Sequence, residues 1–163
     1  VFQKSATRAD FKLEDFRDGY IEGAEVTGNQ IKFVYRKNEK EDIKEAVITA
    51  PNNAVLDGGF DYFVLENWDF ILAGNKKILN LCAPSQQDCF KFVVFKTGEA
   101  KRKGQDVVNM KVELNNPILS TFVKPILLVY SKDTKKLLQY DGISNINNED
   151  GKSHVVRITY DNN

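Results

Sequence analysis

The sequence predicts an α+β fold in which a curled antiparallel sheet of about nine strands clasps one long helix at residues 58–73. Only the stretch DGGFDYFVLENWDFILAGN, residues 57–75, has the apolar spacing of a helix, whereas most other segments alternate as strands do. The apolar residues of this stretch cover more than half of the helix circumference, which is wider than the stripe that one flat sheet face covers. We therefore expect the sheet to curve around the helix.

The ends and the interior of this helix support its assignment. The carboxylate of Asp57 could accept a hydrogen bond from a free amide of the first turn. Gly74 suits the left-handed residue that follows many helices. Asp61 and Asn67 are polar residues within the apolar arc. Trp68 lies inside that arc, so we expect it to be largely buried against the concave face of the sheet, with a partner for its indole N–H.

Strands are predicted where apolar and polar residues alternate between turn residues. Thr27-Gly28-Asn29 separates two such segments and indicates a hairpin. From Phe11 onward the pattern becomes that of strands, and the predicted strands span residues 20–26, 30–37, 43–49, 76–82, 89–97, 106–114, 125–130, 136–141 and 154–160. A loop is expected at residues 98–105. Residues 116–123 are ambiguous, because Asn116-Pro117 could open one helical turn. Neighbouring strands are expected to be mostly antiparallel.

The length and charge of the chain restrict its class. With 163 residues, the chain is long enough for one domain with a substantial core, so a single domain over residues 1–163 is expected. Lys plus Arg residues number 23 and Asp plus Glu residues also number 23, so net charge gives no reason to expect nucleic acid as a partner. No apolar run approaches the ~18 residues that a membrane-spanning helix needs. Because the chain begins at Val1, we expect a removed signal peptide or a fragment.

The two cysteines suggest a cross-link. Cys82 and Cys89 flank Ala83-Pro84-Ser85, which is typical of a turn, so the two thiols could face each other across a hairpin. One interpretation is a disulfide in a protein of an oxidising compartment. The other is a pair of reduced, half-buried thiols in the cytosol. We expect the disulfide.

The search for catalytic motifs finds little. The sequence contains no phosphate loop and no GxGxxG, HExxH, CxxC or GxSxG motif. His154 is the only histidine, and a lone histidine in a strand is more often structural than catalytic. The chain has too few soft ligands to support a metal site. We therefore predict no catalytic residue, no metal and no cofactor, and a non-enzymatic function is favoured.

Two polar clusters stand apart from the apolar pattern. The first contains Arg17, Asp18, Tyr20 and Glu22 beside Gly19 and Gly23, and the second contains Tyr140 and Asn145 around Gly142. Glycines in or beside strands often mark a bulge or a close backbone approach. One interpretation places both clusters at the mouth of a cavity. The favoured interpretation is ion pairing and turn chemistry.

Three segments carry a resemblance to a known family. They are DFRDGYIEGA at residues 15–24, GFDYFVLENWDFILAG at residues 59–74 and LVYSKDTKKLLQYDGISN at residues 128–145. Together they resemble a family of exported bacterial proteins of unknown function, although Ser131 before Lys132-Asp133 departs from the family's hairpin. The resemblance implies export to the periplasm and brings no activity with it.

A looser resemblance concerns the architecture. The predicted sheet and helix are similar to the half-barrel fold of periplasmic lipoprotein carriers, in which a curled antiparallel sheet leaves an apolar cavity beside a helix. This likeness is at the level of fold, and fold does not determine function.

Three functional hypotheses follow. The leading one is a non-enzymatic periplasmic binding protein for an apolar or lipid-like ligand, held between sheet and helix. Its candidate lining residues are Phe33, Tyr35, Phe60, Val64, Trp68 and Ile71. The alternative is a domain with a solid core that binds an envelope protein or acts as a scaffold. The third is a small-molecule enzyme that uses the polar clusters. An apolar cavity would favour the first hypothesis, and an exposed apolar patch would favour the second.

Overall fold

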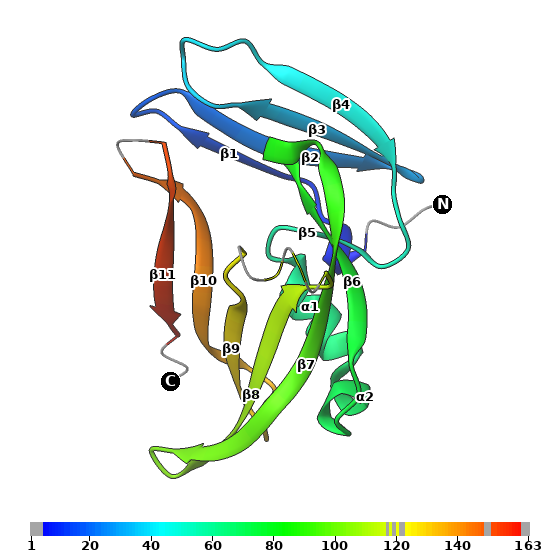
Figure 1. Cartoon of the computed structure of the whole chain (residues 1–163), viewed down its shortest axis with the longest axis vertical. Coiled ribbons are helices and arrows are strands. Elements are labelled where there is room, and N and C mark those ends of the chain that lie inside the picture. The colour runs from blue at the N-terminus through cyan, green and yellow to red at the C-terminus, as the bar shows by residue number, and fades with distance from the viewer. Residues whose placement is uncertain (1–4, 117, 119, 121–122, 149–150, 161–163) are drawn as a thin grey trace. The chain divides into compact units, whose positions relative to one another are not determined.

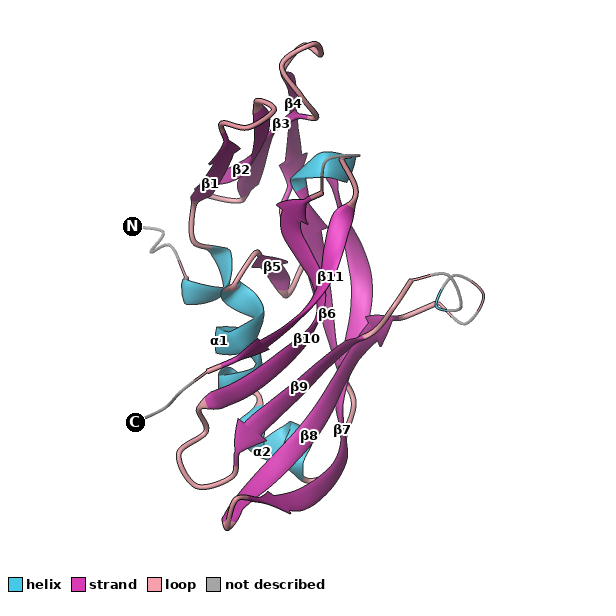
Figure 2. Ribbon diagram, turned by 90° about the vertical axis from the view of Figure 1, so that its left-hand side faces the viewer, coloured by secondary structure: helices cyan, strands magenta, loops and turns pink. Residues whose placement is uncertain are grey.

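Strands dominate the computed structural model, which describes residues 5–116, 118, 120, 123–148 and 151–160. Eleven strands of the described residues form two open sheets, and two short α-helices accompany them (Figures 1 and 2). All strand pairs except one are antiparallel among the pairings assigned there. The predicted α+β class with mainly antiparallel strands is confirmed, but the strands form two sheets where a single curled sheet was expected.

The chain divides into two compact units. The first unit is Val1–Phe63 with Leu79–Lys91, and the second is Val64–Ile78 with Phe92–Asn163. One helix and two strands have residues in both units. The prediction of a single domain stays a prediction, and each unit is described by itself.

The first unit is built around a four-stranded antiparallel meander. Its strands are β1 (Phe11–Asp15), β2 (Tyr20–Thr27), β3 (Gln30–Arg36) and β4 (Lys44–Thr49), paired in chain order. Thr27 pairs with Gln30 across a two-residue turn, and Gly28 adopts φ 58°. The predicted Gly-Asn hairpin is therefore confirmed, since a two-residue hairpin turn needs a positive φ at its first central residue, which glycine adopts readily.

The core of the first unit lies between this meander and a short pair of parallel strands. Strand β5 (Ala54–Leu56) runs parallel to β6 (Lys77–Ala83), with Leu56 opposite Cys82. The buried cluster combines residues from several of these strands, namely Ala24, Val26, Ile31, Phe33, Ala54, Leu56 and Cys82. The alternation of β3 places Ile31 and Phe33 in this core, whereas β2 is buried on both faces over its first half.

The predicted long helix is two helices. They are α1 (Gly59–Glu66) and α2 (Trp68–Leu72), and Asn67 between them has φ −110° and ψ 17°, outside helical values. Asparagine competes for backbone hydrogen bonds and is a weak helix former, which explains why the break falls at this polar residue. The helix begins at Gly59, and Asp57 adopts φ 42°, so Asp57 is not the residue directly before the first turn.

Both ends of the helical region show why glycine is present there. A Cβ atom on Gly59 would lie too close to the carbonyl oxygen of Thr7, in the 3-10 turn η1 (Ala6–Arg8), so only glycine permits this approach. Gly74 follows α2 with φ 92°. The amide of Gly74 donates to the carbonyl of Ile71 and that of Asn75 to Phe70, which completes a Schellman end.

The second unit is an antiparallel sheet with α2. Its strands are β7 (Asp88–Arg102), β8 (Gln105–Leu114), β9 (Ile126–Ser131), β10 (Leu137–Asn147) and β11 (Ser153–Thr159), and they are hydrogen-bonded in chain order. The predicted loop at residues 98–105 is wrong, because β7 continues to Arg102 and only Lys103-Gly104 turn, both with positive φ. The ambiguous segment 116–123 lies partly outside the described residues.

One face of this sheet is buried with α2. Met110 of β8 and Leu128 of β9 pair in register and are both buried. Trp68 is 3% exposed, and its ring meets that of Tyr130 edge-on at 5.6 Å between centroids. The expectation that Trp68 is buried against the sheet is confirmed. No helix in the described part of the chain is long and apolar enough to cross a membrane.

Candidate functional site

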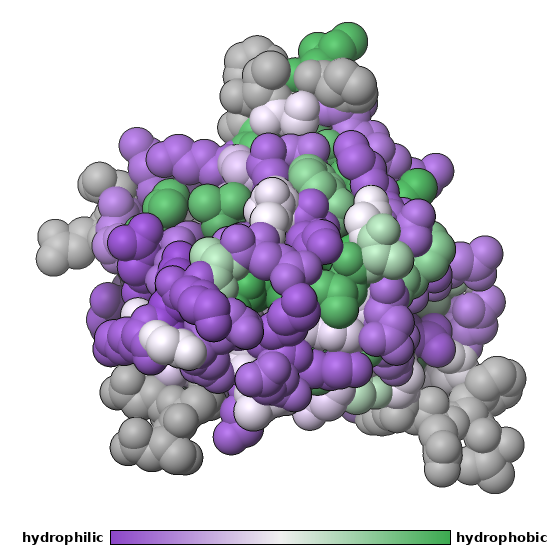
Figure 3. Space-filling model, turned by 90° about the horizontal axis from the view of Figure 1, so that it is seen from below, coloured by the Kyte–Doolittle hydropathy of each residue, from purple (hydrophilic) through white to green (hydrophobic). Residues whose placement is uncertain are grey.

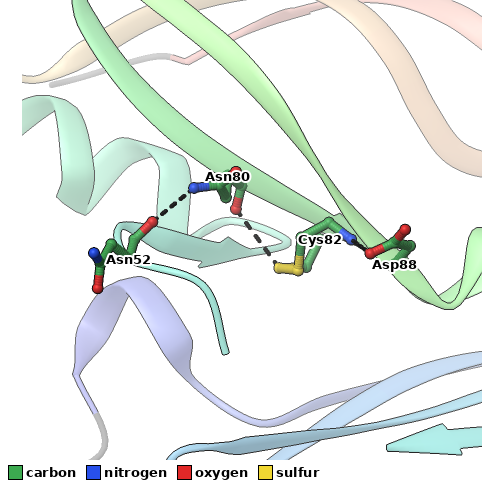
Figure 4. The surroundings of a disulfide bond; sticks show 5 residues. Asn52, Asn80, Cys82 and Asp88 are labelled. Carbon is green, nitrogen blue, oxygen red and sulfur yellow. Dashed lines mark hydrogen bonds between the residues drawn. A yellow bond between two sulfur atoms is a disulfide. The ribbon is translucent and has the colours of Figure 1, made fainter. Parts of the chain in front are cut away.

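The predicted disulfide is present in the first unit. Cys82 at the end of β6 and Cys89 at the start of β7 are bonded, with 3.8 Å between their Cα atoms. The 3-10 turn η2 (Pro84–Gln86) connects the two strands, and Gln87 after it adopts a left-handed conformation. Around the bond, the Asn80 carbonyl oxygen lies 3.6 Å from Cys82 Sγ, and Asn80 Nδ2 donates to the Asn52 carbonyl at 2.7 Å (Figure 4).

Two tyrosines and a carboxylate form a cluster that is partly buried in the first unit. The Tyr20 hydroxyl donates to Glu22 Oε2 at 2.6 Å, and the rings of Tyr20 and Tyr35 meet edge-on at 5.9 Å. Tyr20 is buried, whereas Glu22 and Tyr35 are half-buried. The structure therefore brings together two residues of the first polar cluster and one candidate ligand residue.

Burial governs the titration of this group. Loss of solvent raises the pKa of Glu22, with a smaller contribution from the charge of Asp57, although the Tyr20 hydrogen bond opposes the rise. Burial also raises the pKa of Tyr35, helped by the negative charges of Glu41 and Glu22. A half-buried carboxylate with a raised pKa makes the folded state bind a proton more tightly than the unfolded chain.

The remaining members of the first polar cluster take part in the turn before β2. Arg17 Nε donates to Asp15 Oδ1 at 2.9 Å, and hydrogen bonding to Arg17 lowers the pKa of Asp15 to about 2. Asp18 Oδ1 accepts from the Tyr20 amide at 3.0 Å, and Gly19 has φ 76°. These contacts are the ion pairing and turn chemistry that the sequence favours.

The titration of Glu22 gives a prediction. A raised carboxyl pKa contributes stability that is complete below the unfolded value near 4.3 and is lost as the pH rises through the folded pKa. Glu22→Gln removes this titration and keeps an oxygen acceptor for Tyr20. We expect the stability of the Glu22→Gln variant, relative to the wild type, to increase as the pH rises from 4 to 7.

Urea denaturation at several pH values measures this difference. Asp15, Glu99 and Asp141 have lowered pKa values, so their contributions to the free energy of unfolding are lost as the pH falls. These groups are present in both proteins, so their contributions cancel in the comparison. A constant stability difference across this pH range would contradict the assignment.

The candidate ligand residues are divided between the two units. Phe33, Tyr35 and Phe60 belong to the first unit, while Val64, Trp68 and Ile71 belong to the second. Phe33, Val64, Trp68 and Ile71 are buried. Within the second unit, Trp68 is brought to Tyr130, and the amine of Lys135 lies 5.6 Å from the Trp68 ring. A common apolar cavity for all six residues stays a prediction.

The second polar cluster lies on β10. The Tyr140 hydroxyl donates to the carbonyl of Ile143 at 2.7 Å, and a Cβ on Gly142 would lie 2.7 Å from that hydroxyl oxygen. Because Gly142 has no side chain, the Tyr140 phenol can lie over it and reach the Ile143 carbonyl. This contact lies just before the register shift between Ile143 and Asn147. Asn145 lies within this shift and is exposed.

Strand β11 carries a surface that the sequence interpretation missed. It ends the strand order of its sheet, so one edge has no neighbouring strand among the described residues. On one face Val155, 57% exposed, pairs with Ile143, 50% exposed. On the other face Ile158, 42% exposed, pairs with Tyr140. We call β11, with Ile143 beside it, the β11 edge.

A signal for this surface exists in the sequence. The adjacent residues Val155 and Val156 must point to opposite faces of a strand, so β11 is apolar on both faces. Such strands usually lie inside sheets. The alternation of His154, Val156, Ile158 and Tyr160 describes only one of these faces and does not by itself reveal the other.

Comparison with family models, curated proteins and solved structures finds no match for this chain. The resemblance to exported bacterial proteins therefore stays a prediction. Among residues 5–116, 118, 120, 123–148 and 151–160, no group of three or more His, Cys, Asp or Glu side chains could hold a metal ion.

Proposed function

We propose that this chain is a non-enzymatic interaction domain of an exported envelope protein, and that it binds a protein partner at the β11 edge. The exposure of apolar side chains on both faces of an edge strand supports this proposal. An open strand edge flanked by exposed apolar side chains is a template for pairing with another chain, which would cover that surface.

The surroundings of the β11 edge suit a protein partner. Val155 and Ile143 adjoin the ion pair in which Arg157 Nε donates to Asp141 Oδ1 at 2.6 Å. An apolar centre with a polar rim is typical of protein interfaces. On the face drawn in Figure 3, hydrophobic residues lie in small groups among hydrophilic ones, as on ordinary protein surfaces.

The proposed location outside the cytoplasm is supported by the disulfide. Cys82 and Cys89 are bonded, and such bonds persist in oxidising compartments such as the bacterial periplasm. The resemblance of residues 15–24, 59–74 and 128–145 to exported proteins points in the same direction. We therefore propose the periplasm as its site of action.

Photo-crosslinking in the cells that make the protein tests this function. A photo-reactive residue replaces Val155 in one protein and Val47 in the control. Val47 is the matched choice, because it is also a valine of an edge strand and is also 57% exposed.

We expect protein adducts from position 155 and none from position 47. Mass spectrometry identifies the adduct, and Ile143→Lys in the same chain should remove it. Equal yields from both positions, or no adduct from position 155, would overturn the proposed function.

Binding of an apolar or lipid-like ligand is the second candidate. The buried set Val64, Trp68 and Ile71 in the same unit as Met110 and Tyr130 provides an aromatic and apolar interior that could hold an acyl chain. Titration with oleate and with phospholipid, followed by the emission of Trp68 and the melting temperature, tests it. A saturable change in both is expected, and no change with either lipid would exclude it.

A further inference from the structure

The edge strands of the two sheets differ in how many charged residues they carry, and such residues hinder pairing with a strand of another chain. Strand β1, FKLED, has three charged residues among five, and β4, KEAVIT, carries Lys44 and Glu45. Strand β11, SHVVRIT, has only Arg157, and its guanidinium is held by Asp141. Natural edge strands use lysine, proline and other charges to prevent pairing with another chain. Among these three edges, β11 is the least protected.

The side chains of β11 also favour a strand on its free side. Val155 and Ile158 are exposed on opposite faces, and only Val156 is half-buried in the strand. A new strand beside β11 would cover part of both faces and would pair its backbone groups. This geometry favours an extended strand over a helix as the occupant.

We infer that the occupant is the β11 strand of a second copy of this chain, added antiparallel so that the sheet continues from one copy into the other. This inference rests on the proposed function and names its partner. The chain has a formal net charge of zero, so two copies meet without net repulsion.

The sequence of β11 disfavours one register of this pairing, and we take a register centred on Val156 as the one to test. A two-fold axis at Arg157 would place two Arg157 side chains opposite each other, and like charges in this arrangement are destabilising. An axis at Val156 pairs the two Val156 residues, places Arg157 opposite Val155 and places His154 opposite Ile158. The second register opposes no like charges and gathers apolar residues at its centre.

The size of the contact sets the expected affinity. A pair of seven-residue strands buries less area than a standard stable interface, so a weak and reversible dimer is expected. Its dissociation constant should lie in the micromolar range or above, on the order of 10 to 100 μM.

Sedimentation equilibrium of the purified chain from about 5 to about 500 μM, a range that brackets this dissociation constant, tests the inference. We expect the wild type to shift from monomer to dimer across this range. Val155→Lys should weaken association at least tenfold, because it places a charge at the pairing edge. Val47→Lys, at the equally exposed valine of β4, should leave association unchanged, and circular dichroism confirms that both variants are folded.

Oxidative cross-linking tests the register independently. Val156→Cys would bring two thiols opposite each other at the two-fold axis, so a covalent dimer is expected. His154→Cys lies opposite Ile158 and should give none. Equal cross-linking of both variants would overturn the register.

The results separate this inference from the proposed function. A wild type that stays monomeric at the highest concentration overturns self-pairing, whatever the variants do. If position 155 then gives adducts with a different envelope protein in cells, the interaction function stands and its occupant is that protein. If it gives no adduct, both the inference and the function fail.

Discussion

Trp68→Ala is expected to lower the free energy of unfolding by about 3–5 kcal/mol, since truncation of a buried tryptophan removes apolar burial and leaves a cavity. Trp68 is 3% exposed and lies in the second unit with Tyr130, whose own side chain is fully buried. The substitution also removes the edge-on aromatic contact and the ring under the Lys135 amine.

Phe70→Ala is the matched control for this prediction. Phe70 belongs to the same short helix, α2, but is 48% exposed, so its removal should cost less than about 1 kcal/mol. Urea denaturation followed by far-ultraviolet circular dichroism compares the variants, because the only tryptophan is lost in one of them. A loss below about 1 kcal/mol for Trp68→Ala would show that the sheet does not pack closely on α2.

The sequence predicts the helical region and most strands because their signals are local. Gly74 ends α2 in the expected left-handed conformation, and the alternation of β3 matches the burial of Ile31 and Phe33. The break at Asn67 depends on the balance between a weak helix former and the packing of its neighbours, which the apolar spacing does not record. Strand β5 escapes prediction because its three residues form a strand only through parallel pairing with β6.

The hydrogen-bond partners in the candidate sites are hard to predict from the sequence, because they depend on the positions of whole strands. Arg17 and Glu22 are near each other in sequence, but the structure pairs Arg17 with Asp15 and Glu22 with Tyr20. Partner choice among nearby charges depends on which face of the strand each residue takes. The alternation of β11 was visible, but its position at the end of a sheet is set by strand order, which no local pattern contains.

The structural role of Gly59 is another feature that the sequence alone does not reveal. In the helix pattern Gly59 is only a weak first residue, whereas the structure places the Thr7 backbone against it. A Cβ atom on the neighbouring Gly58 would meet nothing within 4 Å. Two adjacent glycines thus differ in function, because only one of them allows a close approach between chain segments.

Loss of the disulfide is expected to lower the free energy of unfolding by roughly 2–3 kcal/mol, because the cross-link restricts a short loop of the unfolded chain. The bonded cysteines are 7 positions apart, which keeps this entropic contribution modest. Cys82 also belongs to the buried cluster of the first unit, and Cys89 packs against it. The double substitution Cys82→Ala and Cys89→Ala therefore removes packing as well as the cross-link.

Comparison with the reduced wild type separates the two contributions. Reduction keeps both sulfur atoms in the core and removes only the bond, so it should account for most of the lost stability. The free energy of unfolding is measured in urea for the oxidised wild type, the reduced wild type and the double variant. If the reduced protein equals the oxidised protein in stability and only the double variant is weakened, the two cysteines act through core packing and not through the unfolded chain. Thiol titration of the denatured, unreduced protein supplies the starting point, since two free thiols would mean that no cross-link exists to be lost.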